Sequence, residues 1–140
     1  MGIILLRYGE LALKGRNRNE FIRQLRSNIR ACLKMYAIQG DVESVGQRIY
    51  VHTEQVSQAL DPLTRVFGLV SVSPGVQVAR DIQAIIAAAI SLAQESGVCP
   101  SVSFRVRARR ADKTFPATSP EINRIVGEAI QESLGAPVDL

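Results

Sequence analysis

The spacing of apolar and polar residues divides the first part of the chain into six short elements. Apolar runs predict strands at residues 2–7, 42–45, 49–53 and 69–78, and apolar residues at helical spacing predict helices at 17–36 and 56–66. Gly46-Gln47-Arg48 lies between the two middle strands as the turn of a hairpin. Strand, helix, strand, strand, helix and strand in this order are typical of a ferredoxin-like βαββαβ domain, an antiparallel sheet with two helices on one face.

The second part of the chain shows two helical patterns. Asp81 is the expected cap of a helix that ends near Gly97. Ser119 at the N-cap and Pro120 at the first helical position are the expected start of a helix that continues to Leu134.

Between these helices, residues 101–107 alternate as a strand, with Val102, Phe104 and Val106 facing inward. One strand cannot form a sheet by itself, so we expect a chain that is truncated or completed from elsewhere. The predicted class is α+β, with a ferredoxin-like domain at 1–77 and an α/β domain, incomplete at its C-terminus, at 78–140.

The composition is that of a globular chain with an aliphatic core. Of the 140 residues, 46% are hydrophobic and 5% are aromatic, and no apolar run approaches the ~18 residues of a membrane span. The N-terminus lacks the basic region and the cleavage site of a signal peptide. The two cysteines, Cys32 and Cys99, form no C-x-x-C motif, so we expect no zinc site and a reducing, cytoplasmic compartment.

Positive charge is concentrated in one short segment of a chain whose net charge is +4. Five cations and one acid, Asp112, lie between residues 105 and 113, a density that suits a polyanion such as RNA. The candidate RNA-binding residues of this segment are Arg105, Arg107, Arg109, Arg110, Lys113 and Phe115. The charges could instead protect a sheet edge from aggregation, and Phe115 could plug the core rather than stack on a base.

A second basic region begins just before the first long helix. Its residues lie where the free N–H groups of a helix N-terminus favour phosphate, and we take them as further RNA-binding candidates. They are Lys14, Arg16, Asn17 and Arg18. The helix itself carries a basic stripe opposite its apolar face, for which a solvated helix surface is the favoured interpretation. The stripe consists of Arg23, Arg26, Arg30 and Lys34.

No group of residues in the sequence suggests catalysis. The lone histidine, His52, has no evident partner, and the motifs G-x-x-x-x-G-K-[ST], G-x-G-x-x-G and G-x-S-x-G do not occur. We therefore expect no catalytic residue, metal site or cofactor within this chain, and interpret it as a binding module.

Three stretches of the sequence resemble one family, the bacterial and archaeal tRNA 4-thiouridine synthetases, which are tRNA sulfurtransferases called ThiI. L-L-R-Y-G-E-L-A-L-K-G-R-N-R-N-E-F at 5–21 is similar to the opening of these proteins, and R-V-F-G-L-V-S-V-S-P at 65–74 to the last strand of their ferredoxin-like domain. R-R-A-D-K-T-F-P-A-T-S-P-E-I-N-R-I-V-G at 109–127 is similar to the signature of their RNA-binding THUMP domain. The resemblance is in family order and covers essentially the whole chain.

This resemblance implies an ATP-dependent enzyme that adenylates uridine 8 of tRNA and replaces its oxygen with sulfur, and that serves thiamine thiazole synthesis in some organisms. ATP and Mg²⁺ would bind a catalytic domain with an S-G-G-x-D-S-type motif, which this sequence lacks together with the family's catalytic cysteines. The chain then corresponds to the tRNA-binding portion, a ferredoxin-like domain and a partial THUMP domain.

The partners implied by the resemblance are the acceptor stem and CCA end of tRNA, and a cysteine desulfurase as the sulfur donor. The resemblance adds Arg124 to the basic residues at 105–113 that would contact the tRNA. The full-length protein could form a homodimer, and no membrane is expected to take part.

Two other interpretations stay open from the sequence. THUMP domains also occur in RNA methyltransferases, so the chain could be the RNA-binding portion of one of these. It could also be a stand-alone ferredoxin-like RNA-binding protein with no enzyme attached. The opening motif R-Y-G-E-x-x-L-K-G-x-N-R is the feature that favours the thiouridine enzyme.

Overall fold

The chain divides into two compact units, Met1–Gln77 and Val78–Leu140. The computed structural model describes residues 2–9, 17–46, 48–110 and 112–139. Lys14 and Arg16, two of the predicted RNA-binding residues, lie outside the described residues. Within the described ranges, no helix is both long enough and apolar enough to span a membrane.

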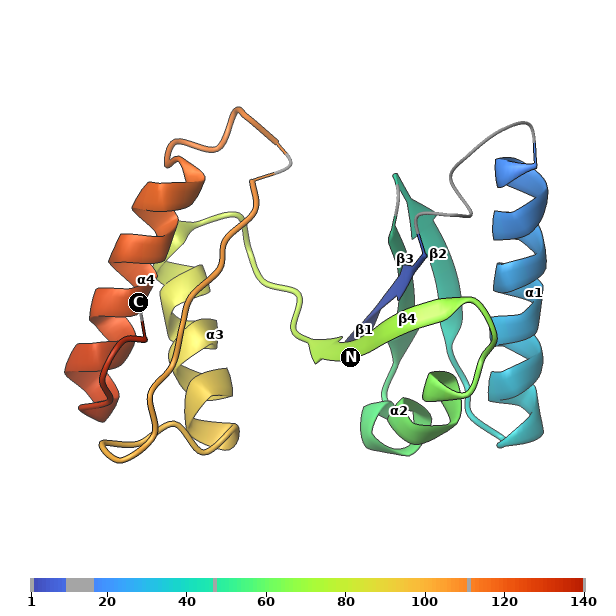
Figure 1. Ribbon diagram of the computed structural model, residues 1–140, viewed down its shortest axis with the longest axis horizontal. Coiled ribbons are helices and arrows are strands. Elements are labelled where there is room, and N and C mark those ends of the chain that lie inside the picture. The colour runs from blue at the N-terminus through green and yellow to red at the C-terminus, as the bar shows by residue number, and fades with distance from the viewer. Residues whose placement is uncertain (1, 10–16, 47, 111, 140) are drawn as a thin grey trace. The chain divides into compact units, whose positions relative to one another are not determined.

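The first unit has the predicted ferredoxin-like fold (Figure 1). Its strands are β1 (Gly2–Tyr8), β2 (Asp41–Val45), β3 (Arg48–Thr53) and β4 (Leu69–Gly75), and its helices are α1 (Arg18–Met35) and α2 (Val56–Thr64). The strands lie in the order β2-β3-β1-β4, and each pairing is antiparallel. The last strand ends at Gly75, three residues before the end expected from its apolar pattern.

A two-residue turn sets the register of the β2–β3 hairpin. Val45 pairs with Arg48, so the ladder closes across a two-residue connection. Gly46 has a φ of 59°, a left-handed value that two-residue hairpin turns require and that glycine adopts without a steric penalty. This register places Ile49 and Val51 on one face of the sheet, where both are fully buried.

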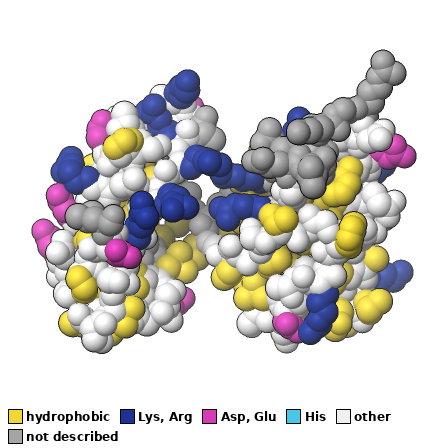
Figure 2. Space-filling view, in the orientation of Figure 1, with side chains coloured by type: hydrophobic (Ala, Val, Ile, Leu, Met, Phe, Trp, Pro, Cys, Tyr) yellow, Lys and Arg dark blue, Asp and Glu magenta, His cyan; other side chains and the backbone are white. Residues whose placement is uncertain are grey.

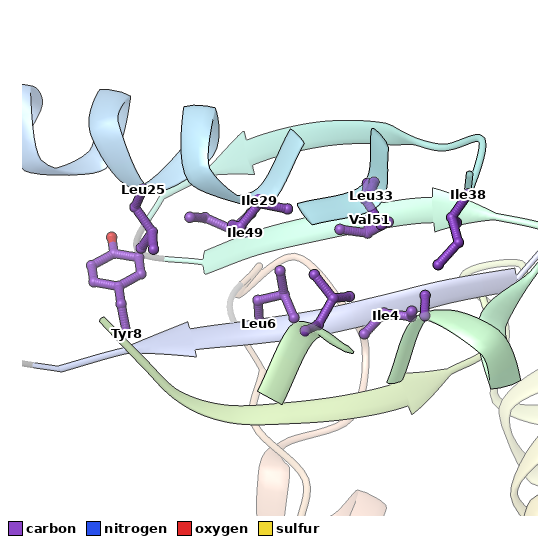
Figure 3. Packing of buried hydrophobic residues seen from close by; sticks show 11 residues of the cluster. Ile4, Leu6, Tyr8, Leu25, Ile29, Leu33, Ile38, Ile49 and Val51 are labelled. Carbon is purple, nitrogen blue, oxygen red and sulfur yellow. The ribbon is translucent and has the colours of Figure 1, made fainter. Parts of the chain in front are cut away.

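The core forms where this face meets α1 (Figure 3). In the β1–β3 ladder, Ile4 lies opposite Val51 and Leu6 opposite Ile49, and all four side chains are completely buried. The buried residues of α1 are Leu25, Ile29 and Leu33. They recur every four residues and so share one side of the helix. Because burying each large aliphatic side chain contributes about 1.5–3 kcal/mol, this layer is the main source of stability in the unit.

The second unit contains two packed helices, α3 (Ile82–Glu95) and α4 (Ser119–Leu134). Its buried apolar residues are Val126, Ile130 and Ala136. Asp81 caps α3 as predicted, with its carboxylate accepting the N–H of Ala84 at 3.3 Å. This unit therefore has a smaller fully buried core than the first.

The strand expected at residues 101–107 is not present among the described residues. A strand needs a partner, and this segment has only isolated bridges, of which a parallel one joins Phe104 to Val138. Two backbone hydrogen bonds of 3.1 and 2.7 Å link Phe104 to residues 137–139. Val102, expected to face inward, is 44% exposed. The predicted alternation of inward and outward residues holds only from Phe104 onward.

The N-cap of α4 is Thr118, and the prediction of Ser119 was wrong. The Thr118 hydroxyl accepts the N–H of Glu121 at 3.3 Å and donates to the Glu121 carboxylate at 2.9 Å. Pro120 lies in the first turn, at the second helical position rather than the predicted first. Two consecutive hydroxyl residues compete for the cap in T-S-P-E, and the Ser119 hydroxyl accepts the backbone N–H of Arg110 instead, at 3.1 Å.

Replacing Thr118 with Ala should lower the free energy of unfolding of the second unit by about 1 kcal/mol, because the N-cap hydroxyl satisfies a backbone N–H that the helix leaves free. Thr118→Ser keeps the hydroxyl and should lose much less. Amide hydrogen exchange at Glu121 measures the local effect, with Ser119→Ala as the neighbouring control. Equal exchange rates at Glu121 in the wild type and in Thr118→Ala would contradict this cap.

Candidate nucleic-acid interface

Three arginines face solvent along the extended segment that precedes α4. Arg105, Arg107 and Arg109 are exposed, whereas Val106 and Ala108 between them are half-buried. This alternation is that of an extended chain, so successive arginines stand on the same side at intervals of about 6.6 Å. Figure 2 shows several Lys and Arg side chains close together on the visible face of the unit that contains α3 and α4.

Side chains of α4 hold this segment in place of a neighbouring strand. The amide oxygen of Asn123 accepts the N–H of Ala108 at 2.6 Å, and the hydroxyl of Ser119 accepts the N–H of Arg110. Both acceptors come from one side of α4, four residues apart. The path of the arginine-bearing segment is therefore set by the helix.

Arg105 and Arg107 line a groove that α4 completes with Arg124. The groove has a volume of about 490 Å³, and its lining includes two acids, Glu128 and Asp139. The Arg124 Nη1 atom lies 3.7 Å from the Glu128 carboxylate one helical turn away, and both side chains are exposed. An exposed pair of this kind contributes little, so Arg124 keeps most of its capacity to bind an anion.

The Arg110 side chain forms hydrogen bonds within the loop that connects the extended segment to α4. Its Nη1 atom donates to the carbonyl oxygens of Phe115 at 3.1 Å and Ala117 at 3.3 Å. The side chain is half-buried, and only its Nε and Nη2 donors are left for another partner. The sequence alone grouped Arg110 with the RNA-binding candidates, whereas the structure shows that it also closes the loop.

Asp112, the one acid of the basic segment, is paired within the same unit. Its carboxylate forms an ion pair with Arg80, a residue that the sequence did not connect with this segment. The same carboxylate accepts the backbone N–H of Thr114 at 2.9 Å and the Thr114 hydroxyl at 2.6 Å. Asp112 thus shapes the loop while Arg80 offsets its charge, and the exposed Lys113 beside it stays available to an anion.

Phe115 is half-buried and belongs to no fully buried cluster. Its backbone N–H donates to the carbonyl of Asp112 at 3.3 Å and closes a turn over residues 112–115. This intermediate exposure fits both packing and stacking, so the two hypotheses for Phe115 stay predictions.

In the first unit, the described candidates are Asn17 and Arg18, at the start of α1. The Asn17 carbonyl accepts the N–H of Phe21 at 2.8 Å, but its side chain forms no capping hydrogen bond. Arg18 lines a hollow together with Arg23 and Arg26. The sequence assigned those last two residues to a solvated stripe. Arg26 follows Arg18 through position 22 at intervals of four, and this spacing was the signal that could have joined it to Arg18.

The histidine and the two cysteines each have a neighbour or an environment that affects their chemistry. His52 Nε2 lies 2.7 Å from the Glu43 carboxylate across the hairpin, a partner that the sequence did not reveal. Burial raises the pKa of the Cys32 thiol, and a hydrogen bond with Ser101 lowers the pKa of the Cys99 thiol. In the part of the chain that the structure describes, no three His, Cys, Asp or Glu side chains are grouped to hold a metal ion.

Two family models match the chain, one for each unit. Residues 3–73, about half of the chain, match the ThiI ferredoxin-like domain. The chain belongs to the ThiI family. Residues 79–140 match the THUMP domain, so the two ThiI units follow one another in the order that the sequence resemblance implied.

This ThiI chain is similar to longer proteins. It is 42% identical over 141 residues to a probable tRNA sulfurtransferase of Brevibacillus brevis, which covers 99% of this chain and 35% of that protein. The crystal structure of PH1313 from Pyrococcus horikoshii is similar to this chain, with a TM-score of 0.89 and 36% sequence identity. The match covers 100% of this chain and 47% of the PH1313 chain. A 4-thiouridine synthetase in complex with RNA and ATP shares the fold, with a TM-score of 0.80 at 24% identity over 100% of this chain and 36% of its own. The chain spans about a third of the length of the curated relatives it matches.

Replacing Arg110 with Ala should loosen the loop over residues 112–117, because two carbonyl groups lose a charged donor. We expect the free energy of unfolding of the THUMP unit to fall by about 1–3 kcal/mol. Arg109→Ala is the matched control, since Arg109 is exposed, and it should change this free energy by less than about 0.5 kcal/mol. Urea unfolding and limited proteolysis of the loop measure both variants. Equal stability and equal cleavage of the two variants would show that Arg110 does not hold the loop.

Proposed function

We propose that this chain is the tRNA-binding portion of a tRNA sulfurtransferase that makes 4-thiouridine at tRNA position 8. The observation that carries the proposal is the convergence of Arg105, Arg107 and Arg124 on one groove of a THUMP unit. The probable tRNA sulfurtransferase of Brevibacillus brevis, similar over 99% of the chain, supports the choice of parent enzyme.

The chemistry of the groove suits an RNA backbone. Arginine forms paired, charge-assisted hydrogen bonds with phosphate oxygens, and proteins recognise A-form RNA mainly through phosphates, 2′-hydroxyls and shape. Arg105, Arg107 and Arg109 stand on one side of an extended segment. The ion pair of Asp112 with Arg80 reduces the repulsion that a free carboxylate would exert on phosphate.

Within the tRNA, we assign this surface to the acceptor stem and the CCA end. The stem offers phosphates to the exposed arginines and Lys113, while an unpaired end offers bases that stack on aromatic side chains. Phe115 is the candidate for stacking because it is only half-buried and lies in the basic loop. Asn17 and Arg18 of the ferredoxin-like unit, together with Lys14 and Arg16, would help to orient the tRNA.

The sulfur-transfer chemistry is assigned to the part of the family enzymes that this chain does not span. ATP with Mg²⁺ would adenylate uridine 8 there, and a cysteine desulfurase would supply the sulfur. The 35% coverage of the Brevibacillus brevis relative supports this division. A role in thiamine thiazole synthesis, a homodimer of the full-length protein and a cytoplasmic location belong to the same proposal.

The purified chain should show no ATP–pyrophosphate exchange and no sulfur transfer to unmodified tRNA, because its sequence lacks a phosphate-binding loop motif. Both reactions are followed with radiolabelled substrate against a control without protein. Exchange above that control would place part of the chemistry in this chain.

Replacing Arg105 and Arg107 with Ala should weaken binding of a tRNA acceptor-stem minihelix and reduce its salt dependence. The slope of log affinity against log salt should become flatter by about 1–2 units, since each lost phosphate contact removes close to one unit. A charge-matched control is Arg48→Ala with Arg65→Ala, which removes two arginines from the other unit, one of them already paired with Asp61. Equal slopes and affinities in the wild type and in the Arg105/Arg107 variant would refute the assignment of this surface to RNA.

A further inference from the structure

A hollow beside the first turns of α1 brings together three arginines and no acid among its described lining residues. It has a volume of about 340 Å³ and lies between α1 and the end of β2 with its turn. Its lining comprises Arg18, Asn19, Ile22, Arg23, Arg26, Ser44 and Gly46. Positions 18, 22 and 26 follow at intervals of four and so share one side of the helix, whereas Glu20, the acid of the first helical turn, points about 160° away from Ile22 by helical geometry.

The arginines of this hollow are held together without a carboxylate partner in the described part of the chain. The ion pairs found there join other residues, and none includes Arg18, Arg23 or Arg26. Three like charges beside a protein wall repel one another more strongly than they would in open water. They also create a local positive potential that attracts an anion.

The Nε atom of Arg26 is a hydrogen-bond donor without an acceptor among the described residues. This atom is also buried. A buried donor without an acceptor costs free energy, and most buried polar groups in proteins are paired. A purely solvated helix stripe would keep this Nε in contact with water, so the burial of Arg26 argues against that interpretation for this end of the helix.

We infer that this hollow is a phosphate site and that its occupant is a phosphodiester group of the RNA strand. Phosphate oxygens accept several hydrogen bonds at once and match the planar fork of a guanidinium, and Ser44 supplies a hydroxyl donor at the same place. Gly46 leaves room at the rim, since no atom lies within 4 Å of the position a Cβ would take. The choice of RNA as the source of the phosphate rests on the proposed function, whereas the phosphate chemistry of the hollow does not.

The site is tested first by removing two of its charges. Arg23→Ala with Arg26→Ala should flatten the salt dependence of minihelix binding by about 1–2 units. Arg30→Ala with Lys34→Ala is the matched control, because it removes two charges from the same helix stripe outside the hollow, and it should leave the slope nearly unchanged. A thermal melt confirms that both variants are folded. An equal loss in the two variants would mean a diffuse positive field and would overturn the site.

A second measurement on the wild type does not depend on a substitution. Inorganic phosphate and the minihelix are titrated separately while ¹H–¹⁵N NMR follows the Arg26 Nε–H and Gly46 amide signals. Saturable shifts of these signals with both ligands support the inference, and no shift with phosphate overturns it. Shifts with phosphate while the minihelix binds elsewhere overturn the choice of RNA. Shifts with phosphate from a chain that does not bind the minihelix at all refute the proposed function and leave the phosphate site standing.

Discussion

The packing of α1 against β1 and β3 is the contact on which the ferredoxin-like unit depends. Leu25, Ile29 and Leu33 lie against the face formed by the alternate residues of the central strands. Because a helix has 3.6 residues per turn, burying this side also decides where every other side chain of α1 lies. The same packing that builds the core thus places Arg23 and Arg26 beside the turn between β2 and β3. Core packing and the inferred phosphate site would then both follow from one helical phase.

In the THUMP unit, side chains form hydrogen bonds with the extended segment that neighbouring strands form in the sheet of the first unit. Asn123 and Ser119 accept backbone N–H groups of the extended segment, and Arg110 donates to two loop carbonyls. Arginines that are close in sequence therefore have different roles. Arg105, Arg107 and Arg109 are exposed on one side of the segment, whereas Arg110 helps to hold the loop that follows. A charge count treats these four residues as equal, and their hydrogen bonds separate them.

The sequence predicts best what depends on local periodicity. The alternation around Ile49 and Val51 and the helical spacing of α1 identify the ferredoxin-like fold because each element shows its own pattern. The prediction of a strand at residues 101–107 was wrong for a non-local reason. A strand needs a pairing partner, and the pattern of inward and outward residues does not show whether one is present. The prediction of the α4 cap was wrong for a local reason, because Thr118 and Ser119 offer the same hydroxyl chemistry. Their hydrogen bonds distinguish them: Thr118 accepts the N–H of Glu121, and Ser119 accepts the N–H of Arg110.

The candidate site follows the same division between local and non-local features. The exposure of alternate arginines could be predicted from their spacing, whereas the ion pair of Asp112 with Arg80 joins residues far apart in sequence and could not. The burial of the Arg26 Nε atom is likewise a tertiary feature. A helical wheel places Arg26 on the basic stripe, but it does not show that Ser44 and Gly46 line the same hollow.

The hydrogen bonds of the groove bear on how RNA would be recognised there. Reading an adenine edge with Asn takes both the oxygen and the NH₂ group of the amide. The oxygen of Asn123, which lines the groove, already accepts the Ala108 N–H at 2.6 Å, so one of its two lone pairs is in use and the amide is oriented by the segment. The charged donors of the groove are the guanidinium groups of Arg105, Arg107 and Arg124, which suit phosphates. Recognition at this surface would then follow the backbone geometry of an A-form stem rather than its sequence. The proposed role would require this kind of selectivity, since tRNA acceptor stems differ in sequence.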